Sequence, residues 1–179
     1  MGEGFAIDWK AQGLVSGDFN GDVRIWKNIE EGALEFHYES NIEDTKWVVE
    51  DVVVSVSDNG FMNFWDIREK KGIVQSVLTT NDEKKEVYSV AVNPFRNNII
   101  LTGGEDQSVK IWDTRNLGSR LHKFDDHEGS VVTLDWSPSK PSIFASGSLD
   151  TKVKIWDLMR VGFEIPKDLG GTDELLVSF

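Results

Sequence analysis

The sequence of 179 residues contains no cysteine, so it can form neither a disulfide framework nor a thiolate metal site. It also lacks long apolar runs: the longest ones, such as Val52–Val54, fall far short of the roughly 18 residues that a membrane helix needs. The opening residues, MGEGFAIDW, lack the charged and apolar regions of a signal peptide, and Ala6 stands where a myristoylation motif requires serine or threonine. We therefore expect an intracellular protein that does not associate with membranes.

Basic residues are in the minority, because 19 Lys and Arg stand against 31 Asp and Glu and give a formal net charge of -12. The electrostatic field of so negatively charged a protein repels the phosphate backbones of nucleic acids and attracts cations. We expect no direct contact with nucleic acid, and a basic peptide or protein as the partner. High net charge also keeps a protein soluble, so charge alone does not decide between these two roles.

One sequence motif recurs four times with variations, as LVSGDFNGDVRIWK, VVSVSDNGFMNFWDIR, IILTGGEDQSVKIWDTR and IFASGSLDTKVKIWDLM. Each copy combines a small or hydroxyl residue, a polar turn, an alternating apolar stretch and a tryptophan. The tryptophans at positions 26, 65, 112 and 156 are 39, 47 and 44 residues apart. This is the period of a four-stranded propeller blade and is too long for an ankyrin or TPR helix pair.

The repeats predict an all-β fold in which about four consecutive four-stranded blades form an incomplete, open β-propeller. Residues 1–179 are expected to be a single domain, with blades at approximately 3–40, 45–80, 86–124 and 129–179. Each blade buries its faces against its neighbours, so an open arc leaves two apolar flanks exposed. The second blade is compressed between Lys46 and Trp65, which means that either its first strand is short or a turn has been lost.

The repeats resemble the WD-repeat family, whose seven-bladed members close a ring by sharing one blade between the chain ends. A closed ring of four blades is also possible in principle. His127, Ser146 and Asp150 have the composition of a hydrolase triad. Their spacing before Trp156 instead matches the structural hydrogen-bond set of WD repeats, so we expect no enzyme. Partial copies of this set stand elsewhere, at Thr102, Asp106 and Trp112; at Ser16, Asn20 and Trp26; and at Ser55, Asn59 and Trp65.

No metal or cofactor site is expected. Asp18, Asn20 and Asp22 stand at the first, third and fifth places of a calcium loop, but Val23 stands where that loop requires glycine. The glycines form neither a GxGxxG nor a GK[ST] pattern after a strand, so no phosphate loop is predicted.

The loops that enter the first strand of each blade line one face of a propeller, and alternate residues on that strand point the same way. Aromatic and acidic side chains there suit a basic tail, although core aromatics and solvated acids would explain the same pattern. Counting back four and six places from anchors at positions 9, 92 and 136 selects Phe5 with Glu3, Tyr88 with Glu86, and Val132 with Ser130.

The stretch from Val87 to Arg160 resembles the retinoblastoma-binding, Msi-type histone-binding subfamily, which includes the chromatin assembly factor small subunit. The NP turn, the WD-x-RN-L link, the L-H-x-F strand and the W-S-P turn recur in order, and GEGFAIDW, VVEDV and GGTDELLVSF are also similar. The resemblance implies a nuclear, non-enzymatic histone-binding subunit of a larger chromatin assembly or histone-modifying complex.

The resemblance also implies site residues. Glu3, Phe5 and Glu50 match the acids and the aromatic that contact a histone tail. Tyr88, Val132 and Ser130 stand where the subfamily has asparagine, phenylalanine and glutamate, which implies a weaker tail site. A second site of the subfamily holds a histone helix between an N-terminal helix, for which we expect no counterpart in this sequence, and an acidic loop. That loop corresponds loosely to Asp168, Asp173, Glu174, Leu175 and Leu176.

The boxes WDIR at 65–68 and WDTR at 112–115 are similar to the WD-x-R box by which some WD-repeat proteins dock on cullin-type ubiquitin ligases. Arg68 and Arg115 would then contact the ligase, or they would simply pair with neighbouring acids. The alternative function is therefore a general WD-repeat interaction scaffold or a substrate adaptor of such a ligase.

Overall fold

The computed structural model describes residues 4–69, 71–80, 85–161 and 175–178, with only the backbone described for residues 4, 5 and 175–178. In this part of the chain, strands β1 to β16 form four antiparallel sheets of four strands each, numbered here sheets 1 to 4 along the sequence. No helix within it is long and apolar enough to cross a membrane.

The strands of each sheet follow one another in chain order. Sheet 1 contains β1 (Gly4–Lys10), β2 (Gly13–Asp18), β3 (Asp22–Trp26) and β4 (Leu34–His37). Sheet 2 contains β5 (Ile42–Val49), β6 (Val52–Ser57), β7 (Phe61–Asp66) and β8 (Ile73–Leu78). Sheet 3 contains β9 (Val87–Val92), β10 (Ile99–Gly104), β11 (Val109–Asp113) and β12 (His122–Phe124). Sheet 4 contains β13 (Val131–Trp136), β14 (Ile143–Ser148), β15 (Val153–Asp157) and β16 (Leu175–Ser178).

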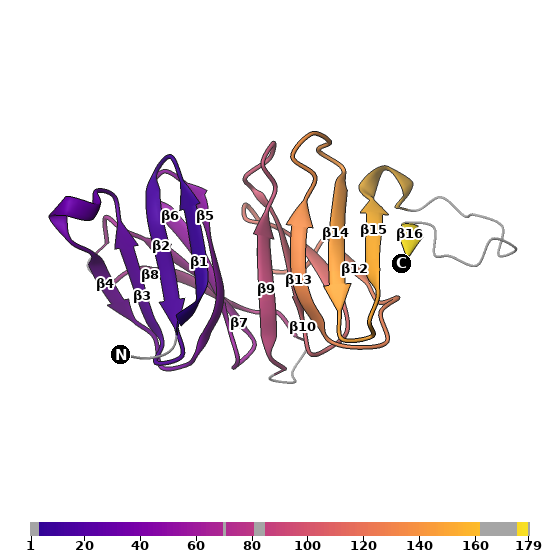
Figure 1. Cartoon of the computed structure of the whole chain (residues 1–179), viewed down its shortest axis with the longest axis horizontal. Coiled ribbons are helices and arrows are strands. Elements are labelled where there is room, and N and C mark those ends of the chain that lie inside the picture. Colours follow the sequence, from indigo (N-terminus) through magenta and orange to yellow (C-terminus); the bar gives the residue numbers. More distant parts are fainter. Residues whose placement is uncertain (1–3, 70, 81–84, 162–174, 179) are drawn as a thin grey trace, which may run out of the picture.

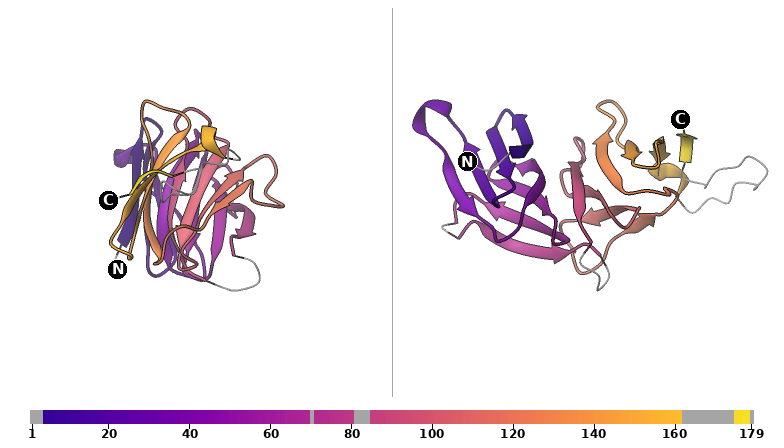
Figure 2. Two further views of the ribbon diagram at one scale, coloured as in Figure 1. Left: turned by 90° about the vertical axis from the view of Figure 1, so that its right-hand side faces the viewer. Right: turned by 60° about the horizontal axis from the view of Figure 1, so that its bottom comes forward.

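The four sheets stand one after another along the long axis of the molecule, with the two ends of the chain at opposite ends of the row (Figure 1). The turned view in Figure 2 shows that the row curves into a crescent whose two arms, sheets 1 and 4, point to the same side. The predicted open, all-β propeller is therefore confirmed.

Each pair of neighbouring sheets shares one hydrophobic cluster. We call the side of a sheet that meets the preceding sheet its leading face, and the other side its trailing face. The trailing face of sheet 3 and the leading face of sheet 4, for example, enclose Leu101, Phe124, Trp136, Phe144 and Trp156. Corresponding clusters join sheets 1 and 2 and sheets 2 and 3. Burial of one such side chain stabilises the fold by roughly 1.5–3 kcal/mol, so the sheets are held together mainly by these contacts.

The compressed second blade is explained by its first turn. β5 is eight residues long, and only Glu50 and Asp51 separate it from β6, so the turn and not the strand is short. Sheet 1 makes the same two-residue connection, whereas sheets 3 and 4 use the longer turns 93–98 and 137–142. In the first of these longer turns Asn93 Oδ1 accepts the backbone N–H groups of Phe95 and Arg96, at 2.9 and 3.0 Å, and so fixes the turn.

Candidate protein-interaction surface

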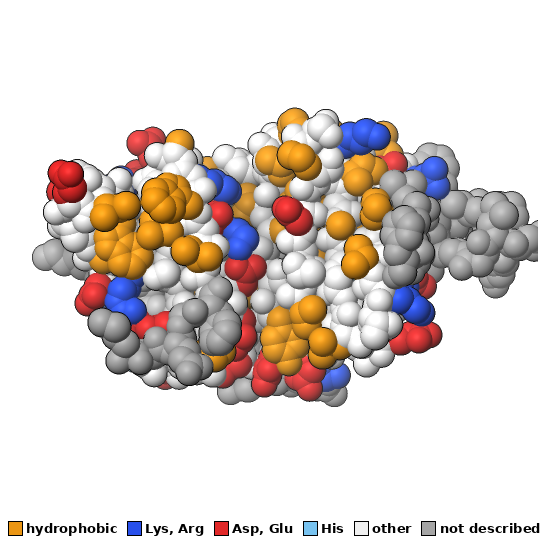
Figure 3. Space-filling view, viewed as in Figure 1, with side chains coloured by type: hydrophobic (Ala, Val, Ile, Leu, Met, Phe, Trp, Pro, Cys, Tyr) orange, Lys and Arg blue, Asp and Glu red, His pale blue; other side chains and the backbone are white. Residues whose placement is uncertain are grey.

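Carboxylates from sheets 2 and 3 gather where β5 and β9 begin. The two strands are tied side by side, because Asp44 Oδ2 accepts the backbone N–H of Val90 at 3.0 Å. Figure 3 shows Asp and Glu side chains along the lower edge of the molecule near its middle. We call this surface the acidic rim and define it by Glu43, Asp58, Glu86, Tyr88 and Glu105, which interact electrostatically with one another.

The acidic rim is electrostatically strained. Burial, followed by the charges of Asp58 and Glu86, raises the pKa of Glu43 above its ordinary value. Burial, the hydrogen bond to Glu86 and the nearby carboxylates raise the pKa of Tyr88 to about 12, so its hydroxyl stays protonated and donates a hydrogen bond to the Glu86 carboxylate. A cation placed here would relieve the repulsion among the carboxylates.

A β-bulge lies at the start of the first strand of every sheet. The register of the first strand against the second shifts around one extra residue in all four sheets, and such bulges re-aim side chains at functional surfaces. The extra residues are Phe5, Glu43, Tyr88 and Val132. Three of these residues are among those predicted from the sequence; the fourth, Glu43, is not, although it lies four places before Trp47, the same spacing that selects the other three from their anchors.

Glu50 does not belong to this surface, which corrects its assignment to the tail site. It lies in the turn between β5 and β6, beside Ala11, Gln12 and Lys27. This turn is at the opposite end of β5 from Glu43, roughly 20 Å away at the usual rise of a strand. Glu3, Asp168, Asp173 and Glu174 lie outside the described residues, and the side chains of Phe5, Leu175 and Leu176 are likewise not described.

The triad-like residues form a buried hydrogen-bonded chain in sheet 4. His127 Nδ1 lies 2.7 Å from Asp150 Oδ2, and its Nε2 lies 2.7 Å from Ser146 Oγ, which also accepts the indole N–H of Trp156 at 2.8 Å. Ser146 is only 1% exposed, so no substrate can reach its hydroxyl. The arrangement satisfies buried polar groups and ties the loop before β13 to the sheet.

The tryptophan–hydroxyl bond recurs in the two middle sheets. Trp65 donates to Ser55 at 2.8 Å, and Trp112 donates to Thr102 at 2.9 Å. Asp106, which was predicted to join the latter pair, instead accepts from Ser108 at 2.8 Å and forms a buried ion pair with Lys110. In this sheet the polar network is therefore divided into two separate units.

We expect the hydrogen bonds of the His127 network to make the stability of the fold depend on pH in the acid range. Burial alone would raise the pKa of Asp150, but the hydrogen bonds from His127, Lys152 and Glu128 outweigh burial and hold it well below its ordinary value of 3.8. A carboxyl group with a lowered pKa stabilises the fold above its unfolded pKa, and this contribution is lost as pH falls through the folded value. We expect the free energy of unfolding, measured in urea, to decline from about pH 5 downward.

Two variants test this assignment. Asp150→Asn should be less stable at neutral pH and should show a shallower decline in acid, whereas Asp125→Asn, at an exposed carboxylate, should keep the wild-type profile. If the free energy of unfolding falls equally with decreasing pH in the wild type and in Asp150→Asn, other carboxylates cause the loss of stability in acid.

The two arginines of the WD-x-R boxes hold equivalent places after β7 and β11. Arg68 Nε lies 2.9 Å from Asp66 Oδ1, and Arg115 Nε lies 2.9 Å from Asp113 Oδ1. The hydrogen bonds from Arg68 lower the pKa of Asp66 to about 2. The arginine side chains are nevertheless 67% and 75% exposed, so each guanidinium keeps one face open to a partner.

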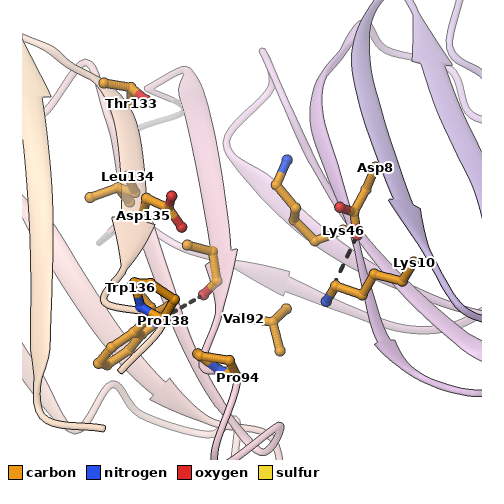
Figure 4. Close-up of a pocket in the computed structure, with 11 residues that line it drawn as sticks. Asp8, Lys10, Lys46, Val92, Pro94, Thr133, Leu134, Asp135, Trp136 and Pro138 are labelled. Atoms are coloured by element: carbon orange, nitrogen blue, oxygen red, sulfur yellow. Dashed lines mark hydrogen bonds and ion pairs between the residues drawn. The ribbon is translucent and has the colours of Figure 1, made fainter. Parts of the chain in front are cut away.

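A cleft of about 490 Å³ opens between the inner strands, and Figure 4 shows its two walls. Lys10 and Lys46 stand on one wall with carboxylate partners, because Lys10 lies 3.8 Å from Asp8 and Lys46 lies 2.6 Å from Asp44. Asp135 stands on the opposite wall. Among the described residues, no group of three or more His, Asp or Glu side chains is placed so that it could hold a metal ion.

Residues 74–113 and 118–157 match the family model described as "WD domain, G-beta repeat". The chain contains WD repeats. Each match starts in or just before the outermost strand of one sheet and continues through three strands of the next, so a sequence repeat bridges two neighbouring sheets.

Two curated relatives are similar to parts of the chain. One is the RbAp48-related WD40 repeat-containing protein prw1 of Schizosaccharomyces pombe, which is 30% identical over 126 residues, or 64% of this chain and 29% of prw1. The other is the DNA damage-binding protein CMR1 of Cryptococcus neoformans, which is 40% identical over 67 residues, or 36% of this chain and 11% of CMR1. The chain thus spans less than a third of the length of either relative.

A solved structure shares the fold. A chain in the crystal structure of the mitotic checkpoint complex superposes with a TM-score of 0.75 at 21% sequence identity, over 86% of this chain and 47% of that chain. The four sheets of this protein therefore correspond to about half of a larger solved chain.

Proposed function

We propose that this chain is a non-enzymatic WD-repeat interaction module that binds basic histone segments on its acidic rim, as part of a nuclear chromatin assembly or histone-modifying complex. The observation that carries the proposal is the placement of Glu43, Tyr88 and Val132 at equivalent bulges, with Glu86 and Glu105 beside Tyr88. The resemblance to the Msi-type subfamily and the similarity to prw1 support the choice of histones among basic proteins.

The chemistry of the rim fits a lysine or arginine side chain. Tyr88 offers an aromatic face against which an alkyl stem or a guanidinium packs, and Glu86 and Glu43 offer carboxylates for the charge. Val132 is 40% exposed and extends the apolar part of the surface onto sheet 4. A basic segment lying across sheets 2, 3 and 4 would contact all of these residues.

Fluorescence anisotropy with labelled histone-tail peptides tests the proposal. Glu86→Gln should weaken binding by about tenfold or more, because a hydrogen bond to a charged group contributes roughly 1.5–3 kcal/mol. Glu31→Gln, which removes an exposed carboxylate from the short 3-10 helix Ile29–Glu31 on sheet 1, is the matched control and should leave the affinity nearly unchanged. Equal losses in the two variants would indicate nonspecific charge attraction.

Peptides with the same composition but scrambled sequence separate histone recognition from attraction to any cation. The wild-type protein should prefer the natural tails over the scrambled ones. Equal affinity for both would contradict the histone assignment and leave a module that binds basic proteins in general.

A second candidate function is that of a scaffold or ligase adaptor, and the exposed, equivalent positions of Arg68 and Arg115 favour it. A purified adaptor subunit of a cullin-type ligase should then bind the wild type, and the double variant Arg68→Ala/Arg115→Ala should lose that binding while keeping its affinity for histone tails. Retention of adaptor binding by the double variant would remove this candidate.

A further inference from the structure

The end of sheets 3 and 4 that lies opposite the acidic rim carries charge of one sign. Four connections meet there: the turns 93–98 and 137–142, the loop 114–121, and residues 158–161 after β15. We call this surface the basic end. In a chain with 31 Asp and Glu against 19 Lys and Arg, these four segments contain no acidic residue. Their basic residues are Arg96, Arg115, Arg120, Lys140 and Arg160.

This bias is confined to one end of two sheets. At the same end of sheets 1 and 2, acidic side chains such as Glu30, Glu50 and Glu69 accompany the basic ones. At the opposite end of sheets 3 and 4, the loops 105–108 and 125–130 are rich in acids, namely Glu105, Asp106, Asp125, Asp126 and Glu128. The two ends of sheets 3 and 4 therefore present local fields of opposite sign.

Hydrogen bonds join the segments of the basic end to one another. The side-chain amide of Asn93 donates to the carbonyl of Pro141 at 2.9 Å and so links the turns of the two sheets. The backbone N–H of Thr114 donates to the carbonyl of Asn98, and that of Leu158 donates to a carbonyl of the second turn, each at 2.9 Å. Because the segments are fixed in this way, a ligand would meet a preorganised surface and lose less affinity to ordering it.

Two cations of the basic end are available to a ligand. Arg96 and Lys140 are exposed on the two linked turns, and neither side chain pairs with an acid within the part of the chain that the structure describes. Arg115, in contrast, is already paired with Asp113 at 2.5 Å. A carboxylate that binds Arg96 and Lys140 therefore displaces no existing ion pair, and the guanidinium can hold it through two parallel hydrogen bonds.

Apolar side chains accompany these cations. Phe95, next to Arg96, is 50% exposed, and Met159, on the short 3-10 helix Leu158–Arg160, is 72% exposed. Figure 3 shows Lys and Arg side chains beside hydrophobic ones at the upper end of sheet 4. A surface that combines cations with exposed apolar groups matches a polypeptide segment in which carboxylates alternate with aromatic or aliphatic side chains.

From this arrangement we propose that the basic end of sheets 3 and 4 binds an acidic segment of a partner protein, with carboxylates on Arg96 and Lys140 and an apolar side chain against Phe95. Charge complementarity selects an acidic ligand. A net charge of -12 repels a long polyanion such as nucleic acid, whereas a short acidic segment gains the apolar contact in addition to its ion pairs. This inference is independent of histone binding at the acidic rim, because the two surfaces lie at opposite ends of the sheets.

Fluorescence anisotropy with a labelled peptide of glutamate and phenylalanine tests the proposal. The wild type should bind this peptide, and Arg96→Ser and Lys140→Ser should each weaken binding by roughly 5- to 10-fold, as expected for a charged hydrogen bond at a partly exposed surface. Lys71→Ser is the matched control, because it removes an exposed lysine from the same end of sheet 2, and it should keep the wild-type affinity. Circular dichroism checks that each variant retains its sheets.

Competition identifies the class of ligand. A peptide of glutamate alone should displace the labelled peptide more weakly than the unlabelled peptide does, and Phe95→Ser should remove that difference. Stronger displacement by a DNA duplex would assign the surface to nucleic acid and overturn the proposal. Absence of peptide binding, or an equal loss in Lys71→Ser, would overturn it as well. Glu86→Gln should leave the affinity for the acidic peptide unchanged, so a failure here is distinguishable from a failure of histone binding.

Discussion

Trp136→Ala is expected to lower the free energy of unfolding by about 3–5 kcal/mol, which is the usual cost of removing a buried tryptophan side chain. Trp9→Ala should change it by less than about 0.5 kcal/mol, as exposed substitutions generally do. The two residues hold equivalent positions in their sheets, but Trp136 is 4% exposed between sheets 3 and 4 and Trp9 is 68% exposed. The comparison therefore isolates the contribution of packing between sheets.

Urea unfolding followed by circular dichroism measures both values. Each variant is compared with the wild type under identical conditions. If the two substitutions cost the same free energy, stability would arise within the individual sheets and not from the clusters between them.

The number and order of the sheets could be predicted because the repeated sequence motif contains the residues that determine the strands and the turn of each sheet. The apolar alternation before each repeated tryptophan specifies a strand, and the polar pair before it specifies the hairpin, so four copies of the motif give four sheets. In sheets 2, 3 and 4 the hydroxyl that accepts the indole N–H could also be predicted, at Ser55, Thr102 and Ser146, from the ten-residue spacing to the tryptophan.

The acidic rim could be predicted only in part, because it depends on register across several strands. Glu86 and Tyr88 follow from counting along β9, whereas Glu43 required the recognition of Trp47 as an anchor. Glu50 was misplaced because sequence similarity alone does not reveal a shortened turn, and the two-residue turn puts this carboxylate at the far end of β5. The pairing of Asp106 with Lys110 depends on which side chains meet on one face, which the motif spacing does not specify.

Glu43→Gln is expected to weaken the binding of basic histone peptides by about 10- to 100-fold, since it removes a charged hydrogen-bond acceptor that contributes roughly 1.5–3 kcal/mol. The same substitution should make the protein more stable at neutral pH. In the wild type, burial and the charges of Asp58 and Glu86 oppose the ionisation of Glu43. A neutral glutamine avoids that cost, so function and stability are opposed at this position.

The pH dependence distinguishes this cause from a change in packing. Because the pKa of Glu43 is raised in the folded state, the native protein binds its proton more tightly than the unfolded chain does, and stability falls as pH rises from the ordinary value of 4.5 through the folded pKa. Glu43→Gln should lack this decline and should gain stability mainly above that range, as measured by urea unfolding between about pH 4 and pH 8. Glu31→Gln should follow the wild-type curve, and a gain in Glu43→Gln that is constant with pH would place its origin in packing and not in the charge of the rim.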